Sequence, residues 1–310
     1  MTALGPNARG ALLALLGFAI YASHDAVIKG LGTRLATPQI VFFVNLLGLP
    51  LAILLLAADR APGRLIPVHP GWMAVRAGGV IVSGIAGFFA FTQLPLTQVY
   101  ALLFATPLLI TLLAIPVLGE RVGLRRGLAV LVGFCGVLIV LRPGSAAIGP
   151  GHLSALLSAL AASMAAVASR RIGRDERPAV MVIWPIMGNI AVMGAVLPAV
   201  YVPVAGADLA MLAFVAACSF AALLMIVMAY RSAEAVVVAP MQYSQILWAT
   251  LFGALFFAET PDPWTFLGAG VVIASGLYIV LREARGGAVS ATQPVLTTAA
   301  RPGTGGDPAA

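Results

Sequence analysis

The nine residues FCGVLIVLR (Phe134–Arg142) are matched by ASGLYIVLR (Ala274–Arg282), and this repetition decides how the chain must fold. Glycine, isoleucine, valine, leucine and arginine coincide in the two stretches at an offset of about 140 residues. Both stretches are apolar and end in a cation, as membrane-spanning helices do where they reach the interface. The sequence therefore predicts a duplicated membrane protein.

Two further pairs of segments keep nearly the same register. Val99–Glu120 aligns with Val238–Glu259, and Gly10–Leu16 aligns with Gly151–Leu157. Apolar sequences match easily by chance, but three segments in the same order indicate a duplication. Each half holds five apolar segments, an odd number, so the second half must be inverted in the membrane relative to the first.

The composition places the whole chain in lipid. Hydrophobic residues make up 61% of the chain and charged residues 9%, with a mean hydropathy of +1.03. A soluble domain is about a quarter charged, so this chain would expose too much apolar surface to water. Its basic residues lie between apolar segments and form no patch interleaved with aromatics, which excludes a nucleic-acid partner. In lipid these segments must be helices, because an open sheet leaves backbone groups unpaired.

The predicted fold is an all-α membrane protein with about ten transmembrane helices arranged as two inverted five-helix repeats. Residues 1–9 form a cytoplasmic N-terminus, 10–142 the first repeat, 150–283 the second repeat, and 286–310 a disordered cytoplasmic tail. The expected spans are 10–31, 36–57, 72–93, 97–118, 123–141, 151–172, 178–200, 207–229, 235–257 and 263–281.

The basic residues predict the orientation. Of the 18 lysines and arginines, all but Lys29, Arg34 and Arg142 fall on the side of the termini. Cytoplasmic loops carry such an excess, so both termini are expected in the cytoplasm of a multi-pass inner-membrane protein. Cys135 and Cys218 lie inside apolar segments, where small packing residues are expected rather than a disulfide or a metal site.

With the repeat in view, the chain resembles the EamA family of the drug/metabolite transporter superfamily. The resemblance rests on the span count, the duplication, and a Pro-containing helix that ends in GER (Gly119–Arg121) before a Gly-rich helix. HDAVIK (His24–Lys29) and QIVFF (Gln39–Phe43) are similar to the branch that contains riboflavin and S-adenosylmethionine uptake carriers. Those carriers commonly place an arginine shortly after the paired Phe, where this chain has Val44.

The first span contains the ionisable residues that are the first candidates for function. Asp25 and Lys29 are one helical turn apart and can pair, and His24 lies beside them. The repeat places alanines opposite His24 and Asp25, so one half alone carries an acid and an imidazole. Asp25 could hold a substrate amine or a proton, and His24 could titrate near neutral pH. The alternative is that Lys29 reaches the outer interface and Asp25 only neutralises it.

The ninth span is the most polar. Gln242, Gln245 and Trp248 recur at helical spacing, Tyr243 lies beside them, and Pro240 weakens the backbone above them. Amides and an indole offer hydrogen bonds and a flat surface without a buried charge. Helix–helix hydrogen bonding is the alternative role.

The repeat places Phe104 and Thr106 of the fourth span opposite Tyr243 and Gln245. Pro107 follows, so both spans are expected to bend near the midplane. The predicted substrate-binding set is His24, Asp25, Phe104, Thr106, Gln242, Tyr243, Gln245 and Trp248.

Weaker candidates are Asn45, Tyr100 and Trp184, each more often a packing residue. Glu120 and Glu259 end their spans at opposite faces and are expected to have a structural role in the loops.

These residues favour a secondary transporter that moves an amino acid, vitamin or nucleoside-like metabolite by alternating access, with protons as a candidate coupling ion. No enzyme motif, nucleotide-binding loop, metal-spaced histidines or cofactor fingerprint is present, so no catalytic residue and no cofactor are predicted. A membrane-embedded enzyme and a channel-like membrane subunit are the alternatives. The first needs a reactive cluster at one face, and the second a continuous polar stripe.

Overall fold

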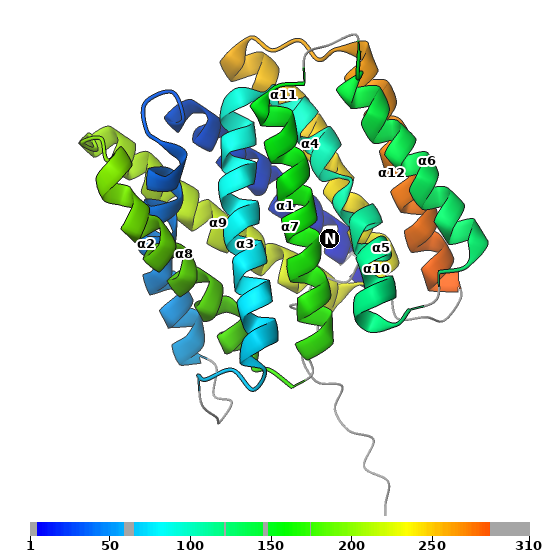
Figure 1. The fold of residues 1–310 in the computed structure, drawn as a ribbon, viewed down its shortest axis with the longest axis horizontal. Coiled ribbons are helices and arrows are strands. Elements are labelled where there is room, and N and C mark those ends of the chain that lie inside the picture. The colour runs from blue at the N-terminus through cyan, green and yellow to red at the C-terminus, as the bar shows by residue number, and fades with distance from the viewer. Residues whose placement is uncertain (1–4, 59–64, 121, 145–147, 174, 286–310) are drawn as a thin grey trace, which may run out of the picture.

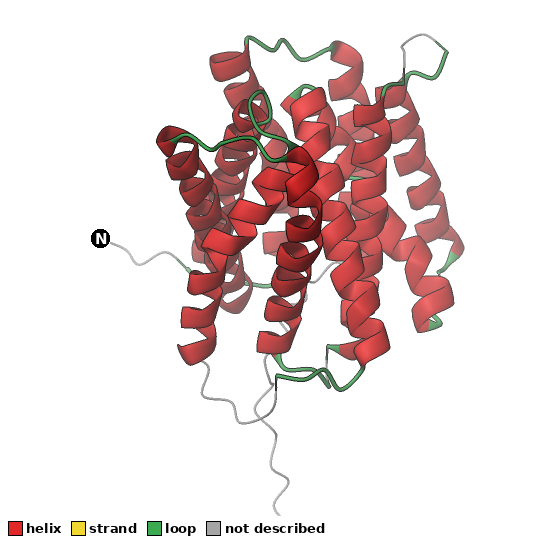
Figure 2. Ribbon diagram, turned by 60° about the vertical axis from the view of Figure 1, so that its left-hand side comes forward, coloured by secondary structure: helices red, strands yellow, loops and turns green. Residues whose placement is uncertain are grey.

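A computed structural model of the protein describes residues 5–58, 65–120, 122–144, 148–173 and 175–285. Within these ranges the secondary structure is helical, and nine helical segments are long and apolar enough to cross a membrane. The connecting loops gather at the two ends of the bundle (Figure 2). Arg121 and the predicted tail 286–310 lie outside the described residues.

The helices follow the predicted order. They are α1 (Pro6–Leu31), α2 (Thr37–Ala58), α3 (Pro70–Gln93), α4 (Leu96–Leu103), α5 (Thr106–Leu118), α6 (Leu124–Leu141), α7 (Pro150–Ile172), α8 (Pro178–Val200), α9 (Gly206–Ser232), α10 (Ala235–Val238), the 3-10 helix η1 (Ala239–Ser244), α11 (Gln245–Phe257) and α12 (Pro263–Arg285).

The predicted ninth span, 235–257, is divided into three pieces. One turn of α-helix, α10, is followed by η1 and then by α11. Pro240 lies at the start of η1, where its missing N–H removes an α-helical hydrogen bond and favours a tighter local helix. The span is polar and broken at the same place.

The fourth span breaks at the corresponding position, between α4 and α5. Pro107 has no N–H to donate to the carbonyl of Leu103 four residues earlier. The hydroxyl of Thr106 donates to that carbonyl instead, at 2.7 Å. Phe104 and Ala105 form the turn between the two pieces. The bends expected from Pro107 and Pro240 are therefore both present.

The helix pairings show the inverted repeat. Helix α3 packs along α7, and its counterpart α9 packs along α1, the counterpart of α7. Helices α2 and α8 pair with each other, as do α6 and α12, so each packs against its own repeat mate. In Figure 1 the α2–α8 and α6–α12 pairs lie at opposite sides, with α3 and α7 in front of α1 and α9. The same set of pairings is obtained when the two halves are exchanged, as expected for halves related by a pseudo-twofold axis.

The packing core lies around the two broken spans. Its largest cluster joins buried side chains of α4, α5, α6, α11 and α12, including Leu102, Leu108 and Val272. A second cluster joins α1, α2 and α9 on the other side of the bundle, around Ile28 and Leu212. The polar part of α1 lies between these two apolar regions.

Candidate functional site

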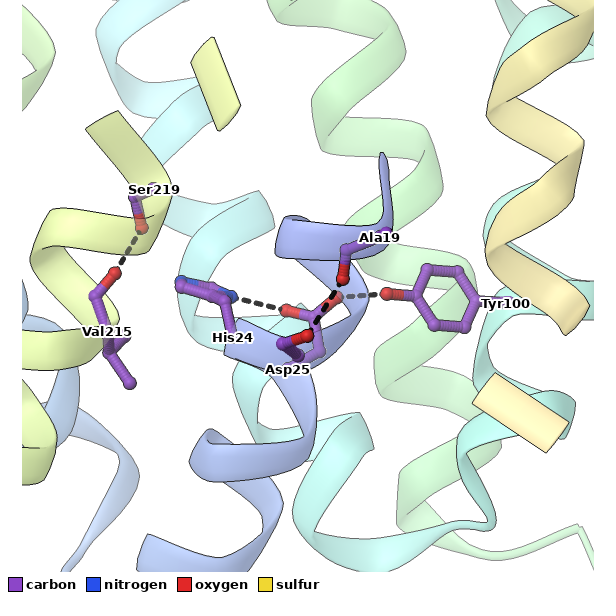
Figure 3. Close-up of polar contacts among 7 residues, drawn as sticks. Ala19, His24, Asp25, Tyr100, Val215 and Ser219 are labelled. Atoms are coloured by element: carbon purple, nitrogen blue, oxygen red, sulfur yellow. Dashed lines mark hydrogen bonds and ion pairs between the residues drawn. The ribbon is translucent and has the colours of Figure 1, made fainter. Parts of the chain in front are cut away.

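Asp25 lies at the centre of a buried polar cluster. Its Oδ1 is 2.7 Å from Nδ1 of His24, and its Oδ2 accepts a hydrogen bond from the Tyr100 hydroxyl of α4. Figure 3 shows Asp25 between these two partners. His24 and Asp25 are 5% and 8% exposed, so the carboxylate needs both partners to offset the loss of water.

The chemistry of the pair fixes its proton arrangement. A carboxylate only accepts hydrogen bonds, so Nδ1 of His24 carries a proton whenever Asp25 is ionised. The His24 ring lies edge-on to Tyr21 and Phe88, with ring centroids 6.1 and 5.7 Å away. It points toward Ser219 of α9 (Figure 3).

The ninth span joins this cluster through Gln245. The side chain of Gln245, the first residue of α11, lies beside the Tyr100 hydroxyl. Helix α11 packs against both α1 and α4. Residues from the first, fourth and ninth spans thus meet at Asp25, and Tyr100, a weaker candidate from sequence, is the one that links them.

Two polar atoms of the ninth span have no hydrogen-bond partner among the described residues. They are Nε1 of Trp248 and Oγ of Ser244, both buried and one helical turn apart. A buried indole N–H without an acceptor is costly, and such groups are usually satisfied by a ligand or water. The Trp248 ring stacks on Phe252, with ring centroids 6.3 Å apart. Gln242, Gln245 and Trp248 are half-buried.

Phe104 and Tyr243 occupy a different environment. Their rings meet edge-on at a centroid distance of 5.0 Å inside the main apolar cluster, where they are 2% and 8% exposed. The Tyr243 hydroxyl lies against Gly276 of α12, where a Cβ atom would approach it to 2.0 Å. The structure places both rings against each other and α12, and Thr106 beside the helix break.

Lys29 does not pair with Asp25, contrary to the expectation from their i, i+4 spacing. Its Nζ lies 2.8 Å from Oε1 of Glu259 at the end of the ninth span. It also donates to the backbone carbonyls of Phe91 and Leu94 at the end of α3. Asp25 is left to Tyr100 and His24, so the alternative in which it only neutralises Lys29 is wrong.

The remaining weak candidates bond to backbone carbonyls. The amide of Asn45 donates to the Val41 carbonyl at 2.8 Å, and the Trp184 indole donates to the Leu65 carbonyl at 3.0 Å. Asn45 bonds within its own helix and Trp184 bonds to the segment before α3, and neither bond involves the Asp25 cluster.

A cavity of about 590 Å³ opens beside the end of α1. It lies between α2, α3 and α7, and its lining is mostly apolar. Its walls include Gly32, Thr37, Phe89, Gln93 and Ser154. None of the eight predicted substrate-binding residues lines it. It leads into the bundle from the face that carries Lys29.

Comparisons with known proteins agree with this architecture. The model of the EamA-like transporter family matches residues 8–142 and 149–281, once in each half. The chain is 30% identical to a riboflavin transporter of Rhizobium johnstonii, over 89% of this chain and 92% of that protein. It is 24% identical to an S-adenosylmethionine uptake transporter of Rickettsia felis, over 87% and 91%.

Two further matches extend the comparison. A pseudopaline exporter of Pseudomonas aeruginosa is 26% identical over 89% of this chain and 97% of that protein. A crystal structure with 19% identity superposes with a TM-score of 0.60, covering 89% of this chain and 96% of the other, and supports the fold alone. The resemblance drawn from the GER and HDAVIK motifs is confirmed. This multi-pass membrane protein belongs to the EamA-like transporter family.

Proposed function

We propose that this protein is a secondary transporter that carries a small organic metabolite across the inner membrane by alternating access. The observation that carries the proposal is Asp25, a buried acid held by side chains at the meeting point of three spans. An ionisable group inside a membrane span is expensive to keep and usually marks a transport pathway.

The proposed binding site surrounds this acid. Asp25 and His24 form one wall, and Gln242, Gln245 and Trp248 form the other. The unpartnered indole N–H of Trp248 supports a ligand that brings an acceptor to this point. Phe104, Thr106 and Tyr243 complete the predicted set at the broken helices, where Phe104 and Tyr243 pack against each other and would have to move to contact a ligand at Asp25.

The lining suits a flat or amphipathic metabolite. Amides, an indole and one carboxylate can bind mixed donors and acceptors, whereas a phosphate would call for clustered arginines. The relatives are named for riboflavin, S-adenosylmethionine and pseudopaline, which supports small organic metabolites as the class. Amino acids, vitamins and nucleoside-like compounds are the candidates for this chain.

Protons are the proposed coupling ion. The Asp25–His24 pair can take up one proton at a site where a substrate cation would compete for the same carboxylate. The transport names of the relatives also argue against an enzyme, and we propose no catalytic role for these residues.

The proposed moving units are the two repeats, 10–142 and 150–283. We place the termini and residues 1–9 and 286–310 in the cytoplasm, from the excess of arginine on that side. The face with Lys29 and Glu259 is then periplasmic, and the face with Glu120 and Arg170 is cytoplasmic.

The test is a thermal-shift screen of purified protein against amino acids, nucleosides and vitamins, followed by uptake of each hit into proteoliposomes. A ligand of the native state raises its melting temperature, and a carrier shows uptake that saturates with concentration. Uptake that rises linearly to high concentration would favour a channel. Chemical conversion of the hit without transport would favour an enzyme.

A further inference from the structure

Two ion pairs at opposite faces of the bundle are related by the repeat. Lys29 pairs with Glu259 at 2.8 Å, and Arg170 pairs with Glu120. Lys29 and Arg170 occupy corresponding positions in the first helix of each half, and the two glutamates correspond at the ends of the fourth and ninth spans. Each pair therefore joins the first helix of one half to the broken span of the other.

The same local backbone positions both glutamates. The residue that follows α5 is Gly119, with φ of 69°, and the residue that follows α11 is Ala258, with φ of 52°. The N–H of the next residue then bonds six residues back, from Glu120 to Ala114 at 3.3 Å and from Glu259 to Gly253 at 3.0 Å. This left-handed helix cap turns each glutamate back toward the bundle.

The residues that form this cap differ between the two halves. Ala258 adopts a left-handed conformation that glycine adopts without strain, as Gly119 does in the first half. At Gly253 a Cβ atom would lie 2.7 Å from Oε2 of Glu259, so a larger residue there would displace the carboxylate. The left-handed Ala258 and the glycine packed against Glu259 point to a role for this glutamate beyond loop structure.

We propose that the two pairs are alternating gate latches, with Lys29–Glu259 closing one face and Arg170–Glu120 the other. The inference rests on the proposed transport function. In an inverted repeat the opening of one face mirrors the opening of the other, so equivalent contacts must break in turn. Both latches are formed in this structure. Lys29, Arg170, Glu120 and Glu259 are thus positioning residues for the transport cycle, apart from the substrate site.

The latch on the Lys29 face is the stronger. Lys29 also donates to the carbonyls of Phe91 and Leu94, and Oε2 of Glu259 accepts the Leu96 N–H at 2.9 Å. Both side chains are 14% exposed. The Arg170 and Glu120 side chains are 22% and 30% exposed, so water screens that pair more. The resting protein should therefore open more readily at the Arg170 face.

Cysteine accessibility tests the latches without any substrate. The reporter is Ser219→Cys on α9, which Figure 3 shows on the same side of Asp25 as His24, in a background with Cys135→Ala and Cys218→Ala. A membrane-impermeant maleimide is applied to right-side-out and inside-out vesicles. The ratio of the two labelling rates measures which face is open.

We expect Glu259→Gln to raise labelling from the Lys29 face about threefold to tenfold, because it loses a half-buried ion pair. Glu120→Gln should raise labelling from the opposite face by a smaller factor. Asp262→Asn is the matched control, since Asp262 pairs with Arg142 on the Lys29 face but joins α6 and α12, which already pack together. It should leave the ratio unchanged.

The double variant Arg170→Glu/Glu120→Arg guards against misfolding, because this exchange does not place a carboxylate against backbone carbonyls as an exchange at Lys29 would. Restoring the ion pair with reversed charges should return the labelling ratio toward that of the parent. The inference is overturned if Glu259→Gln and Glu120→Gln shift the ratio in the same direction, or if neither shifts it. If the ratio responds as expected but no metabolite is transported, the latches stand and the proposed function fails.

Discussion

Replacing Asp25 by asparagine isolates the charge at the centre of the protein. The asparagine amide keeps both contacts, because Oδ1 can accept from Tyr100 or His24 while Nδ2 donates to the other. The protein should therefore still fold and insert. Hydrogen bonds to a charged group are worth about 1.5–3 kcal/mol and those between neutral groups about 0.5–1.5 kcal/mol. With two bonds each weakened by about 1–1.5 kcal/mol, the native state should lose roughly 2–3 kcal/mol.

The effect on ligand binding should be larger if the carboxylate holds a cationic substrate group. Loss of one charge-assisted contact of about 1.5–3 kcal/mol corresponds to a Kd increase of about tenfold to a hundredfold. The assay is the concentration dependence of uptake into proteoliposomes between pH 5 and 8, with ligand-induced thermal shift as the equilibrium measurement. A coupling role for the Asp25–His24 pair would also remove the pH dependence of uptake.

Asp208→Asn is the matched control. Asp208 is 5% exposed and pairs with Arg34 at 2.7 Å, so it is an equally buried acid away from the proposed site. We expect it to lower stability without changing Kd. If Asp25→Asn transports with the parental Kd, rate and pH profile, the reasoning from burial to function is refuted and Asp25 is structural.

Three other predictions can be checked independently. Trp248→Phe removes the unpartnered indole N–H together with the five-membered part of the ring. It should raise substrate Kd about threefold to tenfold by thermal shift, while Trp264→Phe at an exposed position should not; equal effects would contradict a ligand contact. Asp175→Cys should be labelled by impermeant maleimide only from the cytoplasmic side and Thr33→Cys only from the periplasmic side; the reverse pattern would invert the topology. Ala258→Gly should relieve about 1 kcal/mol of backbone strain and raise the melting temperature, and a lower melting temperature would show that the cap is unstrained.

The helical framework could be predicted because membrane spans have a strong local signal. Their length and apolar composition follow from the thickness of the bilayer, and the repeat gave the relative orientation of the halves. The breaks also had a local cause, since Pro107 and Pro240 each remove a backbone donor. These features required no knowledge of which helices touch.

The contacts of the charged residues could not be predicted from spacing alone. Lys29 is one turn from Asp25 but points to Glu259, more than 200 residues later in the chain. Applying the repeat to charges as well as to apolar residues would have found this pair, because Arg170 and Glu120 stand in the matching places.

The side-chain directions in the ninth span were harder still. The helical spacing of Gln242, Gln245 and Trp248 assumes one continuous α-helix, but the chain passes from a 3-10 helix to an α-helix at Gln245. A 3-10 helix has three residues per turn, so side chains before the junction rotate to other faces. Tyr243 turns to α12 in this way, which no α-helical projection would show.

The self-paired helices bear on how the protein arose. A helix that packs against its own repeat mate, as α2 does on α8 and α6 on α12, is the signature of an isologous dimer interface. A single five-helix ancestor could therefore have assembled as an antiparallel homodimer through the same two surfaces. Its copies would have inserted in both orientations, which requires nearly balanced loop charges. Fusion removed that requirement: the loop after the second span now holds Arg60 and Arg64, while the matching loop after the seventh span, 201–205, holds no basic residue. Asp25 of the first helix is matched by alanine in the other half, and it is a second difference that fusion allowed between the halves.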